Sequence, residues 1–175
     1  MIAEVDRSLF HILNEGAHNE VLDNLMVFIT DHRFILFFLI LVPFIMKDRK
    51  KGFFVLAFGI AGIIISSFSV SLLKLLFSRP RPCITLENVR LLIDCHGSFS
   101  MPSGHAATAF TAAAIMGHFI RPAAIIAFIL TLLVGFSRIY VGVHYPADVI
   151  VGIIWGGVIA GGMLFLHSRI SKTSN

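Results

Sequence analysis

The chain has 175 residues, a formal net charge of +4 and an isoelectric point of about 9.4. Hydrophobic residues make up 57% of it, charged residues only 14%, and the mean hydropathy is +0.88. A soluble domain of this size exposes so much surface that it needs more charge, so the composition excludes an ordinary water-soluble fold. We assign the basic excess mainly to the ends of membrane-spanning segments, and expect no nucleic acid partner.

The first 29 residues mix acids and amides with apolar residues at helical spacing. Two groups of apolar residues carry this pattern: Val5, Leu9, Ile12 and Leu13, then Val21, Leu22, Leu25 and Met26. Such a pattern is typical of an amphipathic helix that lies on the membrane surface. The alternative is a frayed tail. We expect residues 1–29 to form an interfacial N-terminal segment.

Five apolar stretches follow this segment. After extension to helix ends, they cover residues 31–46, 52–74, 104–120, 122–140 and 146–167. Each approaches the length of about 20 residues that a membrane-spanning helix needs. We therefore expect an all-α, polytopic membrane helical bundle of about five transmembrane helices. Residues 1–175 are expected to form a single membrane-embedded domain.

The basic residues between these stretches predict the orientation of the chain in the membrane. They gather on one side, in the connections after the first and third stretches and after the last one: Lys47, Arg49, Lys50, Lys51, Arg121, Arg169 and Lys172. Cytoplasmic loops carry an excess of lysine and arginine. The N-terminus is therefore expected outside and the C-terminus inside, with residues 74–105 and 138–148 at the outer side.

Those two outer segments hold three cations that suit one anion. Lys74 and Arg81 belong to the first segment, and Arg138 begins the second. Arginine offers a planar fork for phosphate oxygens, and lysine offers a mobile point charge. Ser103 and Gly104 stand where the third apolar stretch begins, and a helix N-terminus is itself an anion site. We expect these five residues to bind phosphate.

Two histidines and one carboxylate supply reactivity beside these cations. His144 and Asp148 are four residues apart, which places them on one face of a helical turn. A carboxylate on one ring nitrogen leaves the other nitrogen free to attack phosphorus and form a phosphohistidine. His105 then suits the general acid and, later, the general base. We expect no cofactor and no metal, because carboxylates, Cys and His are not spaced as a metal site.

Three motifs with intact spacing carry a resemblance to a known family. They are Lys74, six residues, Arg81-Pro82; Pro102-Ser103-Gly104-His105; and Ser137-Arg138, five residues, His144, three residues, Asp148. This arrangement resembles the type 2 phosphatidic acid phosphatase family, metal-independent enzymes that act on lipid phosphates. The resemblance implies His144 as nucleophile, Asp148 as its partner and His105 as acid. It also implies the phosphate-binding roles already given to Lys74, Arg81, Ser103, Gly104 and Arg138.

The small size of the chain and its outward site resemble small bacterial members of that family. This implies undecaprenyl pyrophosphate as substrate, with lipid A 1-phosphate and phosphatidylglycerophosphate as alternatives. It also implies a multi-pass protein of the bacterial inner membrane with its active site on the periplasmic face, a cytoplasmic C-terminus and membrane lipids around it. A rival of another class is a lipid transporter or flippase, in which intramembrane charges mark a substrate path. Charges confined to one end and the lack of an inverted repeat argue against that rival.

The roles of some residues outside the motifs remain undecided from the sequence. Cys83 and Cys95 either form a disulfide in the outer loop or stay as two free thiols. Arg79 is interpreted as a headgroup anchor or a contact behind the site. Among the histidines that belong to no motif, His96 is the one that the outer loop brings near the site. The paired glycines at 156–157 and 161–162 predict close helix packing.

Overall fold

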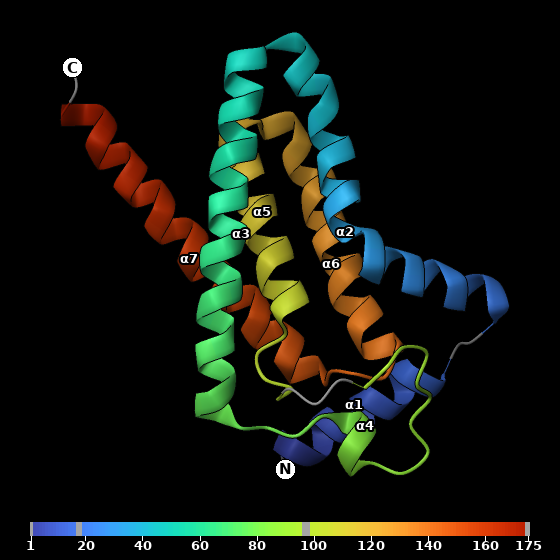
Figure 1. The fold of residues 1–175 in the computed structure, drawn as a ribbon. Coiled ribbons are helices and arrows are strands. Elements are labelled where there is room, and N and C mark those ends of the chain that lie inside the picture. The colour runs from blue at the N-terminus through green and yellow to red at the C-terminus, as the bar shows by residue number, and fades with distance from the viewer. Residues whose placement is uncertain (1, 17–18, 96–98, 174–175) are drawn as a thin grey trace.

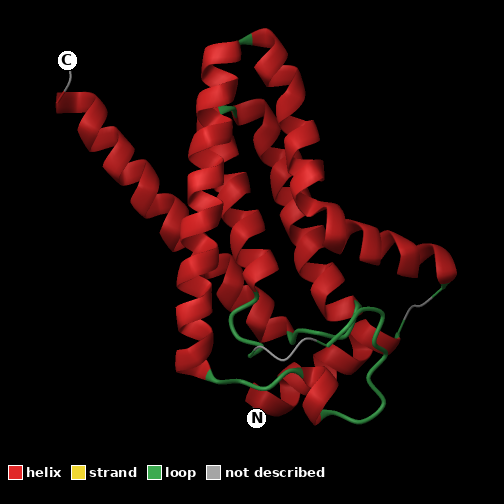
Figure 2. Cartoon of the chain, in the orientation of Figure 1, coloured by secondary structure: helices red, strands yellow, loops and turns green. Residues whose placement is uncertain are grey.

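The structure, a computed structural model, describes residues 2–16, 19–95 and 99–173. Within these ranges the chain forms helices and no strand (Figures 1 and 2). The helices are α1 (Ile2–Glu15), α2 (Glu20–Lys47), α3 (Arg49–Phe77), α4 (Pro82–Thr85), α5 (Gly104–Phe119), α6 (Arg121–Tyr140) and α7 (Pro146–Thr173). The expectation of an all-α membrane helical bundle is confirmed.

Helix α5 forms the centre of the bundle and packs against α2, α3, α6 and α7. Most of its residues are buried, and many of these are small: Ala106, Ala107, Ala109, Ala112 and Ala113. Small side chains allow neighbouring helix backbones to approach closely, which is how helices associate where no hydrophobic effect drives them together. The composition of α5 therefore explains its central place.

The closest approach to α5 comes from glycines of α7. A Cβ at Gly156 would lie 2.3 Å from the carbonyl oxygen of Ala107, so no larger residue fits there. A Cβ at Gly152 would lie 2.5 Å from a backbone oxygen at the start of α5. By contrast, a Cβ at Gly161 or Gly162 meets nothing within 4 Å. The expected close packing thus involves Gly156 and Gly152, and not the second glycine pair.

Four stretches of the described chain are long and apolar enough to cross a membrane: Glu20–Lys47, Arg49–Thr85, Arg121–Tyr140 and Pro146–Lys172. Helix α5 has 16 residues. At about 1.5 Å per residue it is roughly 24 Å long, shorter than a hydrocarbon core of about 30 Å. The expected five spans therefore correspond to four long helices around a shorter central one.

The N-terminal segment is divided differently from the expectation. Residues 20–29 are the first turns of α2, which continues without a break through Asp31. The cap is Asn19, whose side chain accepts a hydrogen bond from the backbone N–H of Leu22 at 2.9 Å. Only α1 is a separate N-terminal helix. In Figure 1 the first turns of α2 extend to the right of the bundle, and the rest of the helix runs upward along it.

Helix α1 has an exposed apolar face and a buried face of mixed character. Leu9 and Ile12 are exposed, as expected of an amphipathic helix. Asp6, Phe10 and Asn14, spaced four residues apart, are buried against the rest of the protein. The buried face contacts α6 and α7 at the lower end of the bundle (Figure 1). Helix α1 is therefore an integral part of that end.

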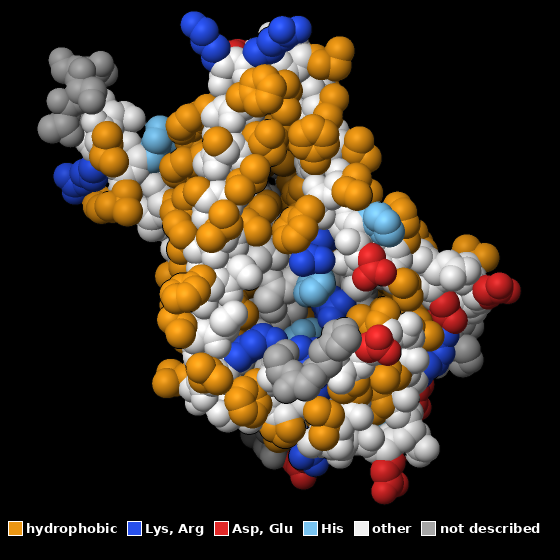
Figure 3. Space-filling model, in the orientation of Figure 1, with side chains coloured by type: hydrophobic (Ala, Val, Ile, Leu, Met, Phe, Trp, Pro, Cys, Tyr) orange, Lys and Arg blue, Asp and Glu red, His pale blue; other side chains and the backbone are white. Residues whose placement is uncertain are grey.

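The two ends of the bundle carry different connections. The turns between α2 and α3 and between α5 and α6 lie at the upper end in Figure 1. The connection from α3 through α4 to α5 and the turn from α6 to α7 lie at the lower end. Figure 3 shows Lys and Arg side chains at the top and a second group, with His, around a hollow lower down. The three motifs meet at this lower end.

Candidate active site

A cavity of about 860 Å³ opens where the three motifs meet. Its lining includes six of the eight residues that the sequence singles out: Lys74, Arg81, Gly104, His105, Arg138 and His144. The other two, Ser103 and Asp148, are fully buried directly behind it. Three segments far apart in the sequence thus supply one site.

His144 lies in the turn between α6 and α7, where Gly142 reverses the chain with φ +89°. A Cβ at Gly142 would lie 2.6 Å from the carbonyl oxygen of Arg90, so glycine is required there. The backbone N–H groups of Val143 and His144 both donate to the carbonyl of Arg138, at 3.3 and 3.2 Å. The turn therefore returns His144 to the side of Arg138.

Asp148 occupies the first turn of α7 and faces His144. Its Oδ2 lies 3.5 Å from Nδ1 of His144, an electrostatic contact that falls short of hydrogen-bond geometry. The same oxygen accepts hydrogen bonds from the backbone N–H of Tyr145 at 2.8 Å and from the Ser100 hydroxyl. The other oxygen, Oδ1, accepts from Nη1 of Arg79 at 2.8 Å. Both carboxylate oxygens are thus held in place beside His144.

Lys74 and Arg81 enter the cavity from the end of α3 and from the connection that follows it. Nζ of Lys74 donates to the carbonyl of Phe99 at 2.7 Å, which ties α3 to the loop before α5. Arg81 is buried, and its Nη1 donates to the carbonyl of Val143 at 3.2 Å. Each cation therefore also fixes a neighbouring segment of the site.

Arg138 is buried in the last turn of α6. Its Nη1 donates to the hydroxyl of Thr30 on α2 at 3.3 Å, and that hydroxyl also bonds to Ser137 at 2.8 Å. Nε of Arg138 is buried without a hydrogen-bond partner among the described residues. Since buried polar groups are normally bonded, this donor is available to an anion in the cavity.

Ser103, Gly104 and His105 form the start of α5. The backbone N–H of Ser103 donates to the carbonyl of Asp148 at 2.9 Å, which joins the second motif to the third. The hydroxyl of Ser103 is buried and has no partner within the described part of the chain. Backbone N–H groups at a helix start face outward and favour negative charge, so this end of α5 suits a phosphate.

The protonation state of His144 follows from its surroundings. Burial lowers the pKa of His144 to about 4, because the imidazolium loses its hydration. The contact with Asp148 offsets part of this effect, and the charge of Arg138 adds to it. At neutral pH the ring is therefore uncharged. Nδ1 is the ring nitrogen that lies near Asp148, and the side chain lines the cavity.

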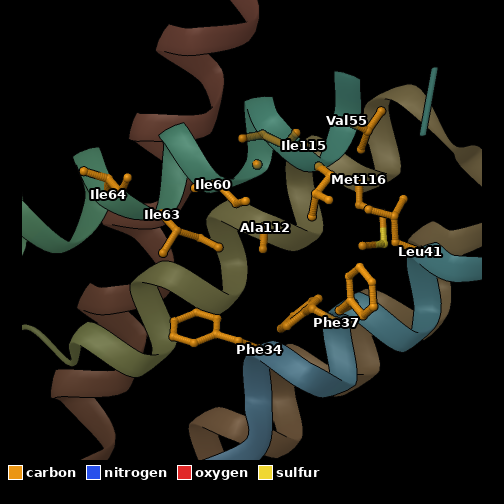
Figure 4. A pocket seen from close by; sticks show the side chains of 13 residues that line it. Phe34, Phe37, Leu41, Val55, Ile60, Ile63, Ile64, Ala112, Ile115 and Met116 are labelled. Carbon is orange, nitrogen blue, oxygen red and sulfur yellow. The ribbon is translucent and has the colours of Figure 1, made fainter. Parts of the chain in front are cut away.

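A second, apolar cavity of about 330 Å³ lies between α2, α3 and α5 (Figure 4). Phe34, Phe37 and Ile63 are among its lining residues, and no charged residue lines it. Phe34 follows Asp31, a residue of the polar cavity, by three positions on α2. Since residues three apart share a helix face, the apolar cavity begins one turn beyond the polar one.

Several site contacts involve residues outside the motifs. Arg79, for which the sequence left open a headgroup anchor or a contact behind the site, bonds directly to Asp148, and Ser100 does so as well. The spacing of Asp6, Phe10 and Asn14 on α1 is the sequence signal that a helix face packs here. His96 lies outside the described residues.

The question left open by the two cysteines is settled. Cys83 and Cys95 form a disulfide, which closes part of the connection between α3 and α5. Within that loop, Leu91, Leu92, Ile93 and Asp94 line one wall of the polar cavity. The bridge therefore holds part of the wall in place. In the described part of the chain, no group of three or more His, Cys, Asp or Glu side chains is arranged to hold a metal ion.

Comparisons with known proteins place the chain in a family. The model of the PAP2 superfamily matches residues 52–172. The undecaprenyl-diphosphatase BcrC of Bacillus subtilis (strain 168) is 36% identical over 159 residues, which cover 89% of this chain and 79% of that protein. The crystal structure of Aquifex aeolicus LpxE matches with a TM-score of 0.76 and 34% identity, covering 91% and 94% of the two chains.

A further crystal structure shares the fold. It is the first transmembrane PAP2 type phosphatidylglycerolphosphate phosphatase from Bacillus subtilis, with a TM-score of 0.73 and 22% identity over 97% of this chain and 87% of that one. Fold, site and relatives define one class: the chain is a lipid phosphate phosphatase, a hydrolase held in the membrane by several helices. The family model covers more than half of its residues, and the chain belongs to the PAP2 superfamily.

Proposed function

We propose that this phosphatase hydrolyses undecaprenyl pyrophosphate to undecaprenyl phosphate and inorganic phosphate, without a metal and through a phosphohistidine at His144. The observation that carries the proposal is a buried His144 that lines the same cavity as Lys74, Arg81 and Arg138. The substrate is suggested by the 36% identical relative, which is named an undecaprenyl-diphosphatase.

The first chemical step transfers the terminal phosphoryl group to the enzyme. Nε2 of His144 attacks the terminal phosphorus, and the bond between that phosphorus and the bridging oxygen breaks. His105 gives a proton to the leaving oxygen of undecaprenyl phosphate. The negative charge of the bound phosphates favours the protonated form of His105 before this step. The proton on Nδ1 of His144 stays in place beside Asp148.

The second step releases the phosphoryl group to water. His105, now neutral, accepts a proton from a water molecule as its oxygen attacks the phosphorus of the phosphohistidine. The nitrogen–phosphorus bond breaks, inorganic phosphate leaves, and the lone pair returns to Nε2 of His144. Lys74, Arg81, Arg138 and the start of α5 stabilise the charge on the equatorial oxygens in both steps.

The apolar cavity suits the part of the lipid chain that lies next to the phosphates. Its walls, between α2, α3 and α5, are hydrocarbon side chains such as Phe34 and Ile63. Because this cavity starts one helical turn from Asp31 of the polar cavity, one amphiphile can place its phosphates in one cavity and its chain in the other. This arrangement supports a lipid rather than a water-soluble phosphate ester as substrate.

Orientation in the membrane follows from the basic residues. Lys47, Lys50 and Lys51 lie at the end of the bundle opposite the site, and all are exposed. The excess of cations in cytoplasmic loops assigns that end to the cytoplasm. The active site then faces the periplasmic side of a bacterial inner membrane, and the C-terminus is cytoplasmic. Reporter fusions check this: activity of an externally active reporter at the C-terminus would contradict it.

The substrate is tested with purified protein in detergent and EDTA. We expect the highest kcat/KM for undecaprenyl pyrophosphate when it is compared with lipid A 1-phosphate and phosphatidylglycerophosphate. A higher value for either alternative would replace the proposed substrate. Full inhibition by EDTA that a divalent ion reverses would overturn the metal-free mechanism. The covalent step is tested by quenching a reaction with labelled terminal phosphate: we expect label on the protein that is stable in base and lost in acid.

A further inference from the structure

Arg79 joins two buried carboxylates that belong to opposite ends of the sequence. Its Nη1 donates to Oδ1 of Asp148 at 2.8 Å, and its Nη2 donates to Oδ2 of Asp6 at 2.6 Å. Asp148 is 0% and Asp6 6% exposed, so neither is solvated by bulk water. The guanidinium also lies over the ring of Tyr145 at 4.0 Å from its centroid. The guanidinium of Arg79 is therefore held by a carboxylate at each of two nitrogens and by the Tyr145 ring against one of its faces.

Asp6 makes a second contact with the nucleophile segment. Its Oδ1 accepts the backbone N–H of Ala147 at 2.8 Å, in the first turn of α7. The unpaired N–H groups of a helix start are usually capped by a nearby side chain from the same chain segment. Here the cap comes from α1, and the capped residue directly precedes Asp148. Asp6 thus holds both Arg79 and the helix turn that carries Asp148.

Helix α1 is itself held in place, so that Asp6 can fix Arg79 and the first turn of α7. The side chain of Asn14 donates to the carbonyls of Arg90 and Tyr140 at 2.9 and 2.8 Å, and accepts from the N–H of Arg90 at 2.9 Å. The ring of Phe10 is fully buried, with its centroid 5.6 Å from that of Tyr145. Asp6 therefore sits on a docked helix and not on a frayed tail.

We propose that Asp6 and Arg79 are positioning residues of the active site, which orient Asp148 and set the charge that it presents to His144. The proposal rests on the role of His144 as nucleophile. Arg79 neutralises part of the charge of Asp148 on the oxygen turned away from His144. Asp6 in turn neutralises part of the charge of Arg79. Helix α1 is by this argument part of the catalytic apparatus, although no motif residue lies on it.

The chain of charges predicts opposite effects for the two residues. The groups that act on His144 are Asp148 from α7, Arg138 from α6, Arg81 from the connection after α3, and His105 from α5, with Lys74 in the same cavity. Without Arg79, the full charge of Asp148 favours the imidazolium, and the pKa of His144 rises. Without the charge of Asp6, Arg79 acts more strongly on Asp148, and the pKa of His144 stays the same or falls.

The experiment measures the pH dependence of kcat and kcat/KM with farnesyl pyrophosphate in detergent micelles as the probe. For Arg79→Gln we expect kcat to fall about 10- to 100-fold, the usual effect of losing a residue that orients a catalytic group. In this variant the acid limb, the pH range in which kcat/KM falls as the pH is lowered, should lie at higher pH than in the wild type. For Asp6→Asn, which keeps the cap on Ala147, the acid limb should lie at or below that of the wild type.

Two further variants separate positioning from folding. Arg79→Lys keeps the charge but cannot bridge two carboxylates, so we expect the acid limb of the wild type with a lowered kcat. Glu4→Gln removes an exposed acid from the same helix, and both kinetic constants should stay within about twofold, as for most surface changes. Size-exclusion profiles in detergent show which variants fold.

The result that would overturn the proposal is an unchanged acid limb in Arg79→Gln, or an upward shift in Asp6→Asn as large as that in Arg79→Gln. Either would show that the bridge serves only to dock α1. The underlying function is checked separately with His144→Ala. If His144→Ala keeps its activity, His144 is not the nucleophile, and the proposed function fails. An inactive one, together with wild-type profiles for both bridge variants, rejects the bridge alone.

Discussion

The two ends of the bundle use the same basic side chains in opposite ways. The turn between α2 and α3, at the upper end in Figure 1, carries Lys47, Arg49, Lys50 and Lys51, which are all exposed. At the lower end, Arg81 and Arg138 are each 6% exposed and Lys74 is half-buried around one cavity. A solvated cation costs little and interacts weakly, whereas a buried one is stabilised only by a partner of opposite charge or by hydrogen bonds.

This difference explains why charge alone says little about function in this chain. The exposed cations serve orientation in the membrane, which depends on their number and not on their geometry. The buried cations are each bonded to a particular backbone or hydroxyl oxygen, so their positions are fixed before a phosphate arrives. Such preorganisation is the condition under which electrostatic stabilisation of a transition state is large.

The largest effect is expected from His144, the buried histidine of the lower end. His144→Ala should lower kcat by about 10³-fold or more, because the covalent step loses its nucleophile. The matched control is His118→Ala, which changes an exposed histidine at the opposite end and should leave kcat unchanged. Phosphate release from a lipid phosphate measures both. Comparable losses in the two variants would mean that His144 acts through stability and not through chemistry.

Two lysines of one helix give the next test of the comparison. Lys74 stands in the last turn of α3 and lines the cavity, whereas Lys51 stands in its first turn and is exposed. Lys74→Ala should lower kcat/KM by about 10²-fold, since one charge aimed at the transferring phosphoryl group is lost. Lys51→Ala should change it less than about twofold. Equal effects would contradict the division between the two ends.

The sequence alone indicates most of the polar cavity. Motif spacing brings together His144 and Asp148 because residues four apart share a helix face, and it places Gly104 at a helix start because a polar, proline-containing stretch meets an apolar one. These are local rules, and the structure places Gly104 and His144 in the lining of one cavity with Asp148 behind it.

What the sequence does not indicate depends on contacts between distant segments. Asp6 and Ala147 are joined by a hydrogen bond although they are 141 positions apart in the sequence, and no local spacing relates them. The sequence also does not show where α2 begins, and the structure places its cap at Asn19. The sequence cannot decide between a headgroup anchor and a contact behind the site for Arg79, because its partners lie on α1 and α7.

The pH dependence sharpens the comparison further. An exposed histidine has an ordinary pKa of about 6.5 and would lose its free lone pair as the pH falls below that value. The pKa of His144 is lowered to about 4 by burial, so the ring stays neutral and nucleophilic at pH 5. We therefore expect kcat/KM of the wild type to show no acid limb above about pH 5. If kcat/KM instead falls below about pH 6.5 because the nucleophile becomes protonated, His144 is solvated.

The smallest effect is expected from the disulfide, which belongs to the lower end but lies outside the cluster of charges. Cys83 and Cys95 close the loop whose residues 91–94 form one wall of the cavity. Without the bridge, binding must order this wall, at a cost of about 0.5–1 kcal/mol, which raises KM about 2- to 5-fold. The kcat value should stay the same, because His144 and Asp148 are held by Tyr145 and Arg79 and not by the loop. The double variant Cys83→Ser/Cys95→Ser and the wild type treated with dithiothreitol should agree, and dithiothreitol should leave the double variant unaffected. A fall in kcat as large as that of Lys74→Ala would instead place the loop in the chemical step, and the wall would then belong with the buried charges.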